Sequence, residues 1–325
     1  MSDISTEQAA WFSQQASRLS SSIQQVIRGK ANIVDLVVVA ILSEGHILLE
    51  DVPGTGKTTL ARAVAEAIDG TWKRIQFTPD LLPSDVTGAQ IYNQASAAFE
   101  FHPGAVFANI VLADEINRAS PKTQSALLEV MEERQHTIDA QSYPMPRPFV
   151  VVATQNPVEQ DGTYRLPEAQ LDRFLLKTSL GYLSLESEVE VLSGAGSVRK
   201  SASVALSASD VRDLISIADR IHVETSILTY VAQLAAATRS HPQLRLGVST
   251  RGGMALLRAS RALAAMNGQS YVTPDHVQHL IQPIFGHRML LTAEAELKRV
   301  ETSEIVQQIL SDIPVPSSRG LEASA

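Results

Sequence analysis

Two kinds of hydrophobic spacing alternate along the first part of the chain. Apolar residues recur at helical spacing between residues 6 and 27, and a second apolar helix is expected over 32–42. Short apolar runs bounded by turn residues instead predict buried strands at 46–49, 110–113 and 149–153, and residues 74–77 and 175–180 are further strand candidates. A helix over 58–68 is expected after the first strand. Buried strands that alternate with helices are typical of a parallel sheet with helices on both faces.

Two turn-rich stretches interrupt this alternation. Residues 88–106 contain short runs of alternating polar and apolar residues, and residues 136–148 alternate around Gln141-Ser142. Alternation with a period of two is the pattern of a half-exposed strand. Both stretches are therefore predicted to be β-hairpins inserted into the α/β pattern.

The composition changes beyond residue 192. A stretch rich in Ser, Gly and Ala predicts a linker over 193–208, and the pattern after it is helical. Ser209-Asp210 is expected to cap a helix over 211–221, and Thr273-Pro274 to begin another. Two further helices are expected at 224–239 and 252–266. The sequence thus predicts an α/β core with its N-terminal helix over 1–192, the linker 193–208, a smaller all-helical domain over 209–312 and a disordered tail over 313–325.

Composition and charge narrow the class of protein. With 325 residues, 44% of them hydrophobic, the chain is long enough for two packed domains. Its formal net charge of −8 disfavours non-specific nucleic-acid binding, because an acidic surface repels phosphates. The absence of cysteine excludes disulfides and thiolate metal sites. A polar N-terminal segment and an apolar run (36–42) far shorter than the roughly 20 residues that span a bilayer predict a cytoplasmic protein without membrane insertion.

The segment Pro53-Gly54-Thr55-Gly56-Lys57-Thr58 lies between the first strand and the helix that follows it. This is the context of a phosphate-binding loop, in which backbone N–H groups and the helix N-terminus face the phosphates. Lys57 would reach the β- and γ-phosphates, and the Thr58 hydroxyl would ligate Mg²⁺. The pattern G-x-x-x-x-G-K-[ST] expects glycine at position 51, where this chain has Asp51. The alternative is an ordinary Gly-rich turn, which Lys-Thr at the right offset after a buried strand disfavours.

Asp114 and Glu115 end the hydrophobic strand 110–113. A strand-end aspartate can hold Mg²⁺ through water, and the adjacent glutamate can polarise the attacking water. An exposed acidic pair would be the simpler interpretation of these two residues alone. Their position after a phosphate loop in the same sheet favours the catalytic interpretation.

Three further polar residues are candidates with weaker local support. Asn156 follows the fourth strand, where a polar side chain could touch the γ-phosphate, but it could also be a turn or cap residue. Arg173 follows Asp172 before the fifth strand, and the alternative is a surface Asp–Arg pair. Arg251 begins a helix, where a phosphate would offset its conflict with the helix dipole, and the alternative is a solvated arginine. Glu132 and Glu133 fit a solvated helix face, and the eight histidines show no metal-ligand spacing.

These segments together resemble the MoxR family of AAA+ ATPases. The resemblance covers about residues 20–310 and is most specific in 46–58, 111–119, 121–133, 153–157 and 166–174. It implies a P-loop NTPase (AAA+) fold, an α/β parallel-sheet domain followed by a smaller all-helical lid domain. MoxR-like sequences commonly carry Asp at the position of Asp51. The two hairpins resemble the helix-2 insert and the pre-sensor-1 insert of this AAA+ clade.

The resemblance also implies a role for each candidate residue. It assigns ATP binding to Ile27, Gly29, Pro53, Gly54, Thr55, Gly56, Lys57, Thr58, Thr59 and Asp114. It assigns Mg²⁺ to Thr58 and Asp114, the latter through water. It assigns catalysis to Glu115 of Walker B, Asn156 as sensor 1, Arg173 as the arginine finger and Arg251 as sensor 2.

Members of this family resemble ring-forming, chaperone-like ATPases that act with von Willebrand factor A domain proteins. The implied function is Mg²⁺-dependent ATP hydrolysis at the subunit interfaces of a homo-oligomer, expected to be a hexameric ring, that remodels or matures a client protein. The von Willebrand factor A partner would be on another chain. Two alternatives stay open: a nucleotide-dependent assembly scaffold with little turnover, and a DNA-directed AAA+ motor, against which the acidic charge argues.

Overall fold

The computed structural model describes residues 4–52, 54–138, 140–156, 163–164, 166–182, 185–193 and 201–316. Pro53 and most of the predicted tail lie outside these residues, as do positions 194–200 of the predicted linker. Contacts within the chain define two compact units. The first consists of Arg18–Phe174 and Thr178–Arg212, and the larger part of the second follows residue 212. The division falls within α1 (Thr6–Gln24), β9 (Leu176–Thr178) and α8 (Ala208–Ala218).

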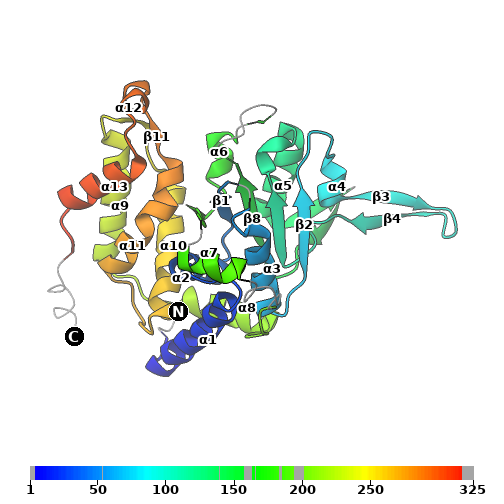
Figure 1. Cartoon of the computed structure of the whole chain (residues 1–325), viewed down its shortest axis with the longest axis horizontal. Helices are drawn as coiled ribbons and strands as arrows, with labels where there is room; N and C mark the ends of the chain where they lie inside the picture. Colours follow the sequence, from blue (N-terminus) through cyan, green and yellow to red (C-terminus); the bar gives the residue numbers. More distant parts are fainter. Residues whose placement is uncertain are drawn as a thin grey trace. The chain divides into compact units, whose positions relative to one another are not determined.

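The first unit is built on a five-stranded sheet in the order β2-β5-β8-β1-β9 (Figure 1). Its remaining strands are β1 (Ile47–Glu50), β2 (Trp72–Gln76), β5 (Ile110–Asp114) and β8 (Val150–Gln155). The pairs β1–β8, β5–β8 and β2–β5 are parallel, as the buried apolar runs predicted. Because parallel strands end at one edge of the sheet, the loops after β1, β5 and β8 meet there.

Helices cover the middle of the sheet because strands β1, β5 and β8 are apolar and buried along almost their whole length. The helices of this unit are α2 (Ala31–Leu42), α3 (Lys57–Ala67), α4 (Pro83–Thr87), α5 (Pro121–Glu133), α6 (Glu168–Leu171) and α7 (Leu185–Leu192). Alternate strand residues such as Leu48, Val111 and Ala153 share one buried cluster with Leu127 and Leu128 of α5. Helix α3, which begins directly after the predicted phosphate loop, packs on β2 and β5.

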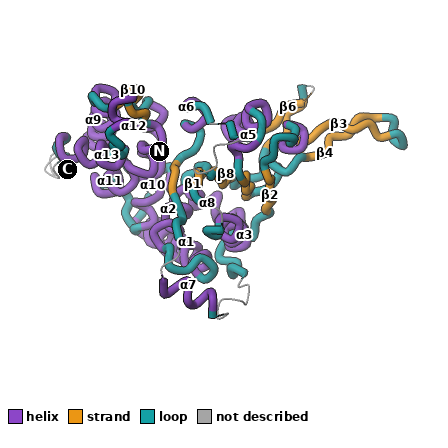
Figure 2. The backbone as a smooth tube through the Cα atoms, turned by 45° about the horizontal axis from the view of Figure 1, so that its top comes forward, coloured by secondary structure: helices purple, strands orange, loops and turns teal. Residues whose placement is uncertain are grey.

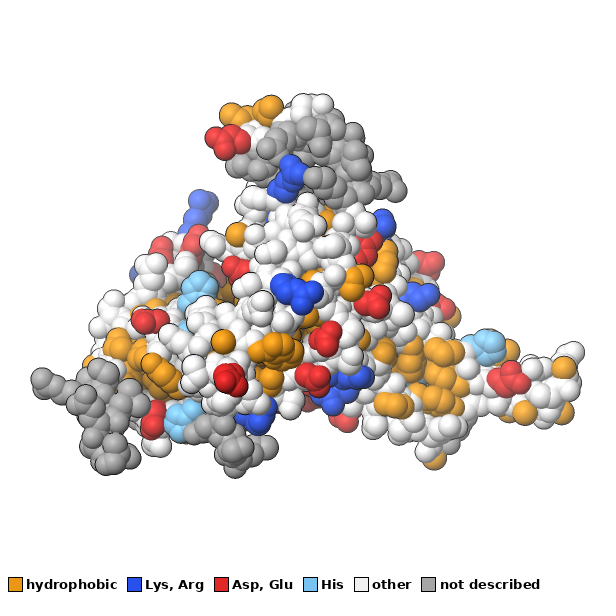
Figure 3. All heavy atoms as spheres, turned by 90° about the horizontal axis from the view of Figure 1, so that it is seen from below, with side chains coloured by type: hydrophobic (Ala, Val, Ile, Leu, Met, Phe, Trp, Pro, Cys, Tyr) orange, Lys and Arg blue, Asp and Glu red, His pale blue; other side chains and the backbone are white. Residues whose placement is uncertain are grey.

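Both predicted hairpins are present. Strands β3 (Gly88–Asn93) and β4 (Ala98–Pro103) form a long antiparallel hairpin that projects from its unit in Figure 1. Hydrophobic side chains lie along it at the right of Figure 3, and three are at least half exposed: Ile91 51%, Tyr92 52% and Phe99 67%. At its base Phe101 stacks on Tyr143 of the second hairpin, with ring centroids 4.1 Å apart.

The second hairpin consists of β6 (Gln135–Ile138) and β7 (Gln141–Pro144). Ile138 pairs with Gln141 and Thr137 with Ser142, so Gln141 and Ser142 lie within a strand and are not the centre of the alternation. Ala140, with a φ of 66°, lies in the connection between the strands. An alternation with a period of two shows which face of a strand a residue occupies, but it does not locate the turn. For this reason the sequence placed Gln141 and Ser142 at the centre of the hairpin and not within its second strand.

The second unit is almost wholly helical (Figure 2). Its helices are α9 (Thr225–Ser240), α10 (Thr250–Met266), α11 (Pro274–Phe285), α12 (Ala293–Leu297) and α13 (Thr302–Asp312). Thr273 and Pro274 begin α11 as predicted. The sequence did not predict the small antiparallel sheet of β10 (Leu244–Leu246) and β11 (Leu290–Leu291), which is too short to show a period. No described helix is long and apolar enough to cross a membrane.

The start of α8 differs from its prediction. The helix begins at Ala208, where Ser207 and Asp210 form the cap: Asp210 N donates to Ser207 Oγ at 3.2 Å and Ser207 N donates to Asp210 Oδ2 at 2.8 Å. These Ser207 donors hold the pKa of Asp210 below its usual value. The preceding residues attach to the end of α3, since Ala202 N donates to Glu66 Oε2 at 3.0 Å and Ala205 N to Ala67 O at 2.9 Å.

Glu44 joins the turn before β1 to the two ends of the second hairpin. Arg134 donates to its carboxylate and to its carbonyl oxygen, and Arg147 donates to Oε1 from Nε at 2.9 Å and from Nη2 at 2.6 Å. Burial raises the pKa of Glu44, but the hydrogen bonds and charges of Arg147 and Arg134 lower it by more, and the pKa lies below 4.5.

Glu44→Gln is expected to destabilise the fold by about 1–3 kcal/mol at neutral pH, because it weakens the hydrogen bonds that the partly buried Glu44 carboxylate accepts from two charged groups. A depressed folded-state pKa contributes stability above the unfolded pKa of about 4.5, and that contribution is lost as pH falls through the folded value. The difference in Tm between variant and wild type should therefore narrow in acid. Glu294→Gln, in an exposed pair with Lys298, is the control and should change Tm little. A pH-independent difference would contradict this assignment.

Candidate functional site

The predicted phosphate loop connects β1 to α3. Gly54 and Gly56 have φ values of 85° and 94°, which side chains other than glycine rarely adopt. A Cβ built on either residue would meet nothing within 4 Å, so the space beside the loop is open. Gly56 is the N-cap of α3 and provides no side chain to cap the N–H groups of the first turn. The loop therefore presents a helix N-terminus to open space, as phosphate binding requires.

Lys57 is the first residue of α3 and turns back over the loop. Its Nζ donates to the carbonyl oxygens of Asp51 at 2.9 Å and Val52 at 3.2 Å. Thr58 is half-buried beside it, and Thr59 is exposed. The Lys57 ammonium and the Thr58 hydroxyl thus both belong to the first turn of α3.

Thr154 binds both residues of the predicted acidic pair. Its hydroxyl donates to Asp114 Oδ1 at 2.6 Å and accepts from the backbone N–H of Glu115 at 2.9 Å. Thr154 is fully buried, and Asp114 is 7% exposed. Glu115 has a φ of 57° and ψ of 49°, a left-handed conformation that is uncommon outside glycine. Such backbone outliers are concentrated at functional sites.

Two residues of β2 hold the carboxylates of the acidic pair. Arg74 donates to Asp114 Oδ2 from Nη2 at 2.6 Å and Nε at 3.2 Å, and Gln76 donates to Glu115 Oε2 at 2.9 Å. Arg118 also donates to Glu115 Oε2, at 3.0 Å. The sequence did not single out Thr154, Arg74 or Gln76 for these contacts. Arg74 and Gln76 flank buried Ile75 and so share a face, but only the pairing of β2 with β5 places them at the acidic pair.

The other candidates lie on separate elements. Asn156 directly follows β8, as the sequence predicted, and its side chain is buried. Arg173 follows α6, and its Nη2 lies 3.1 Å from Oε2 of Glu132 on α5. The sequence did not predict this ion pair, because Glu132 was expected to lie on a solvated helix face. Arg251 is the second residue of α10, after the N-cap Ser249, and belongs to the helical unit. The catalytic roles of these residues stay predictions.

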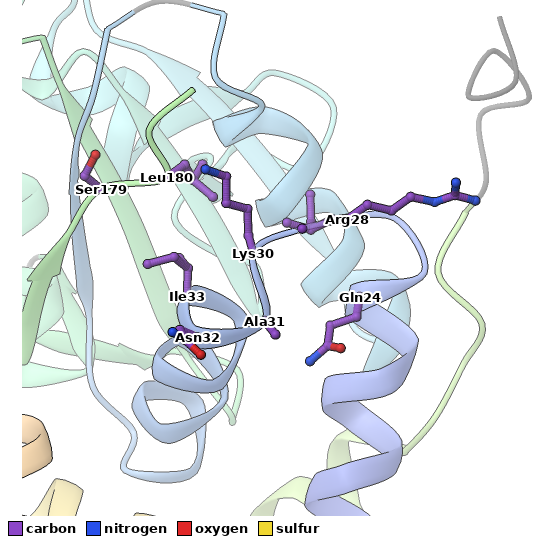
Figure 4. A pocket seen from close by; sticks show the side chains of 10 residues that line it. Gln24, Arg28, Lys30, Ala31, Asn32, Ile33, Ser179 and Leu180 are labelled. Carbon is purple, nitrogen blue, oxygen red and sulfur yellow. The ribbon is translucent and has the colours of Figure 1, made fainter. Parts of the chain in front are cut away.

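A pocket of about 650 Å³ lies where residues 24–33 face the segment after β9 (Figure 4). Ile27 and Gly29, which the resemblance assigns to ATP binding, line it together with Ser179 and Leu180. In Figure 4 the side chain of Lys30 extends toward Leu180, whereas that of Arg28 points away from the pocket.

The residues present fit a magnesium nucleotide. Thr58 and Asp114 supply the hard oxygen atoms that Mg²⁺ prefers, and Mg²⁺ commonly completes its shell with substrate phosphates and water. Among the described residues there is no group of three or more His, Asp or Glu side chains that could hold a metal ion by themselves. Open space beside Gly54 and Gly56 is compatible with a phosphate chain.

Comparison with known proteins places this geometry in a family. Residues 46–176 match the ATPase family associated with various cellular activities (AAA), and residues 236–309 match the AAA lid domain. The chain is 48% identical over 299 residues to the uncharacterized protein YeaC of Bacillus subtilis, covering 91% of this chain and 93% of the relative. It is 41% identical over 303 residues to Chaperone MoxR1 of Mycobacterium tuberculosis, covering 90% of this chain and 80% of the relative.

A solved structure agrees with these sequence matches. A crystal structure of an ATPase candidate from Cytophaga hutchinsonii superposes with a TM-score of 0.89 at 38% identity, covering 96% of this chain and 98% of that one. Protein MoxR of Paracoccus denitrificans is 30% identical over 326 residues, covering 92% of this chain and 95% of the relative. The predicted fold, an α/β AAA+ domain with a helical lid, is thereby confirmed. The chain belongs to the MoxR family of AAA+ ATPases.

Proposed function

We propose that this protein binds ATP with Mg²⁺ and hydrolyses it. One observation carries the proposal: Thr154 binds both Asp114 and Glu115 at the sheet edge where the phosphate loop also begins. An acidic pair so placed is suited to a metal–phosphate centre and its attacking water. Family membership supports the same activity, because the matched family is one of ATPases.

Lys57 and the first turn of α3 would bind the phosphates. The Lys57 ammonium now donates to two loop carbonyls, and a phosphate oxygen would be a stronger, charged acceptor for it. Thr58 and Asp114 would hold Mg²⁺, which supplies positive charge against the phosphate oxygens when bound. Ile27 and Gly29 would contact adenine in the pocket.

Glu115 would act on the water. Its carboxylate is fixed by Gln76 and Arg118, and its backbone by Thr154, so the side chain is held in place before a substrate arrives. A carboxylate in this position can orient a water molecule and accept its proton. Asn156, buried at the next strand end, would orient the same water or the γ-phosphate.

We further propose a ring, expected to be hexameric, in which Arg173 and Arg251 contact nucleotide at subunit interfaces. The work of the ring would be chaperone-like remodelling of a client protein, with a von Willebrand factor A domain protein as partner. The name of the relative Chaperone MoxR1 supports this class of function. A scaffold with little turnover is less well supported, because Glu115 and Arg173 are both present and Glu115 has the left-handed backbone that is concentrated at functional sites.

Lys57→Ala tests the nucleotide site directly. Removing the ammonium leaves phosphate charge unneutralised, so ATP affinity measured by calorimetry should fall at least about a hundredfold. Lys298→Ala, which removes an exposed lysine of the helical unit, is the matched control and should bind ATP like the wild type. Unchanged affinity in Lys57→Ala would remove the phosphate loop from the proposed site.

A further inference from the structure

Asp51 stands where the general phosphate-loop pattern has glycine, and its side chain is used by none of the roles described above. It is 4% exposed, and its carboxylate accepts three hydrogen bonds from one short segment after β9. Ser179 Oγ donates to Oδ1 at 2.8 Å, Leu180 N to Oδ2 at 2.6 Å and Gly181 N to Oδ1 at 2.9 Å. Loop and segment are almost 130 residues apart in the sequence, so this is a tertiary contact.

The backbone of Asp51 makes two further bonds at the sheet edge. Its N–H donates to Gln155 O at 3.2 Å, beside the end of β8, and its carbonyl oxygen accepts from Lys57 Nζ at 2.9 Å. Asp51 therefore connects three parts of the site: the phosphate-loop lysine, the strand end that precedes Asn156, and the segment 179–181.

That segment is a wall of the pocket. Ser179 and Leu180 line it opposite residues 27–33 (Figure 4). The wall is also held from the other side, since Lys30 Nζ donates to the carbonyl oxygen of Tyr182 at 2.5 Å. Gly181 lies between these anchors with a φ of 62°, so the segment turns tightly there.

We propose that Asp51 is a positioning residue that fixes the nucleoside-binding wall to the phosphate loop. This inference rests on the proposed nucleotide site. It predicts that Asp51, by fixing the wall, increases the affinity for the purine nucleoside part of ATP. Without the carboxylate, the N–H groups of Leu180 and Gly181 would lose their acceptors, and buried Leu180 would no longer be held in the wall. The phosphate loop itself would keep its glycines, its lysine and its helix N-terminus.

Asparagine is the sharpest replacement, because it keeps the shape of aspartate. Its amide oxygen can still accept from part of the segment, but its NH₂ group must face an N–H or O–H donor that Asp51 now binds. Glycine is a useful second replacement, since Asp51→Gly restores the general phosphate-loop pattern and removes all three acceptor contacts.

The test compares ATP with inorganic tripolyphosphate, which lacks the nucleoside, by calorimetry in the presence of Mg²⁺ on the full chain. Asp51→Asn and Asp51→Gly should weaken ATP binding about ten- to thirtyfold, the effect of losing charged hydrogen-bond acceptors, and leave tripolyphosphate within about twofold of wild type. Ser179→Ala removes one of the three bonds and should shift ATP binding in the same direction by less. Asp69→Asn, at an exposed position with a φ of 48°, is the matched control.

The outcomes separate this inference from the proposed function. If the wild-type protein binds neither ligand, the nucleotide site itself is wrong. If ATP and tripolyphosphate weaken equally in the Asp51 variants, Asp51 supports the loop in general and the inference is overturned. Unchanged binding of both ligands overturns it as well. Should both Asp51 variants fail to fold, Ser179→Ala decides, because equal affinities of that variant and wild type for ATP would also overturn the inference.

Discussion

Glu115→Gln is expected to bind ATP with wild-type affinity and to hydrolyse it at least about a hundredfold more slowly, as the loss of a general base requires. Glutamine is nearly isosteric with glutamate, and its amide oxygen can still accept from Gln76 and Arg118. The backbone bond from residue 115 to Thr154 does not involve the side chain at all. The substitution thus removes the proton acceptor and leaves the geometry of the site in place.

Steady-state phosphate release and calorimetric ATP affinity should be measured on the same preparation. Glu133→Gln, on the exposed end of α5, makes the same chemical change outside the site and should retain full turnover. Hydrolysis by Glu115→Gln near the wild-type rate would place the base elsewhere and reopen the scaffold alternative. If turnover is lost as expected, the ATP-bound variant also becomes a trap with which oligomeric state and client can be recovered together.

Arg173→Ala is expected to bind ATP normally and to lose on the order of a thousandfold in turnover, the effect of removing an arginine finger. A guanidinium stays charged at all relevant pH and donates paired hydrogen bonds to phosphoryl oxygens. In this chain the Arg173 side chain is 27% exposed and pairs with Glu132 of α5 rather than with a described residue of the phosphate loop. The family resemblance assigns Arg173 as an arginine finger, and we expect it to act on the nucleotide of a neighbouring subunit.

Mixing experiments test that expectation. Arg173→Ala subunits keep an intact acidic pair, and Glu115→Gln subunits keep an intact finger, so mixed rings should regain part of the activity that each variant lacks. Subunit exchange is verified by labelling, and Arg212→Ala, which removes an exposed arginine on α8, serves as the substitution control. If exchange occurs and the mixture shows only the sum of two inactive populations, Arg173 acts within its own subunit or only structurally.

The sequence by itself determined the features that depend on neighbouring residues. A continuous apolar run such as 110–113 predicts a buried strand, and the following Asp114 and Glu115 are then placed at its end without further information. The Gly54 and Gly56 pattern likewise predicted a loop that leads into α3, because these glycines, the lysine and the helix start lie within a few residues. Periods of two and 3.6 residues are local properties, so they predicted these elements, although the start of α8, the turn of the second hairpin and the short β10–β11 sheet were not correctly predicted.

Only the tertiary structure decided which distant residues meet. Gln76 reaches Glu115 because β2 lies beside β5, and Thr154 reaches Asp114 because β8 lies on the other side, and both contacts span about 40 residues. The buried carboxylate of Asp51 accepts its three hydrogen bonds from residues after β9, which are almost 130 positions later in the sequence. A hydrophobic period shows that a strand is buried and which side chains share a face, but it carries no information on the order of the strands. The partners of a strand-end polar group follow from that order, and the order is set by how the helices and strands pack together.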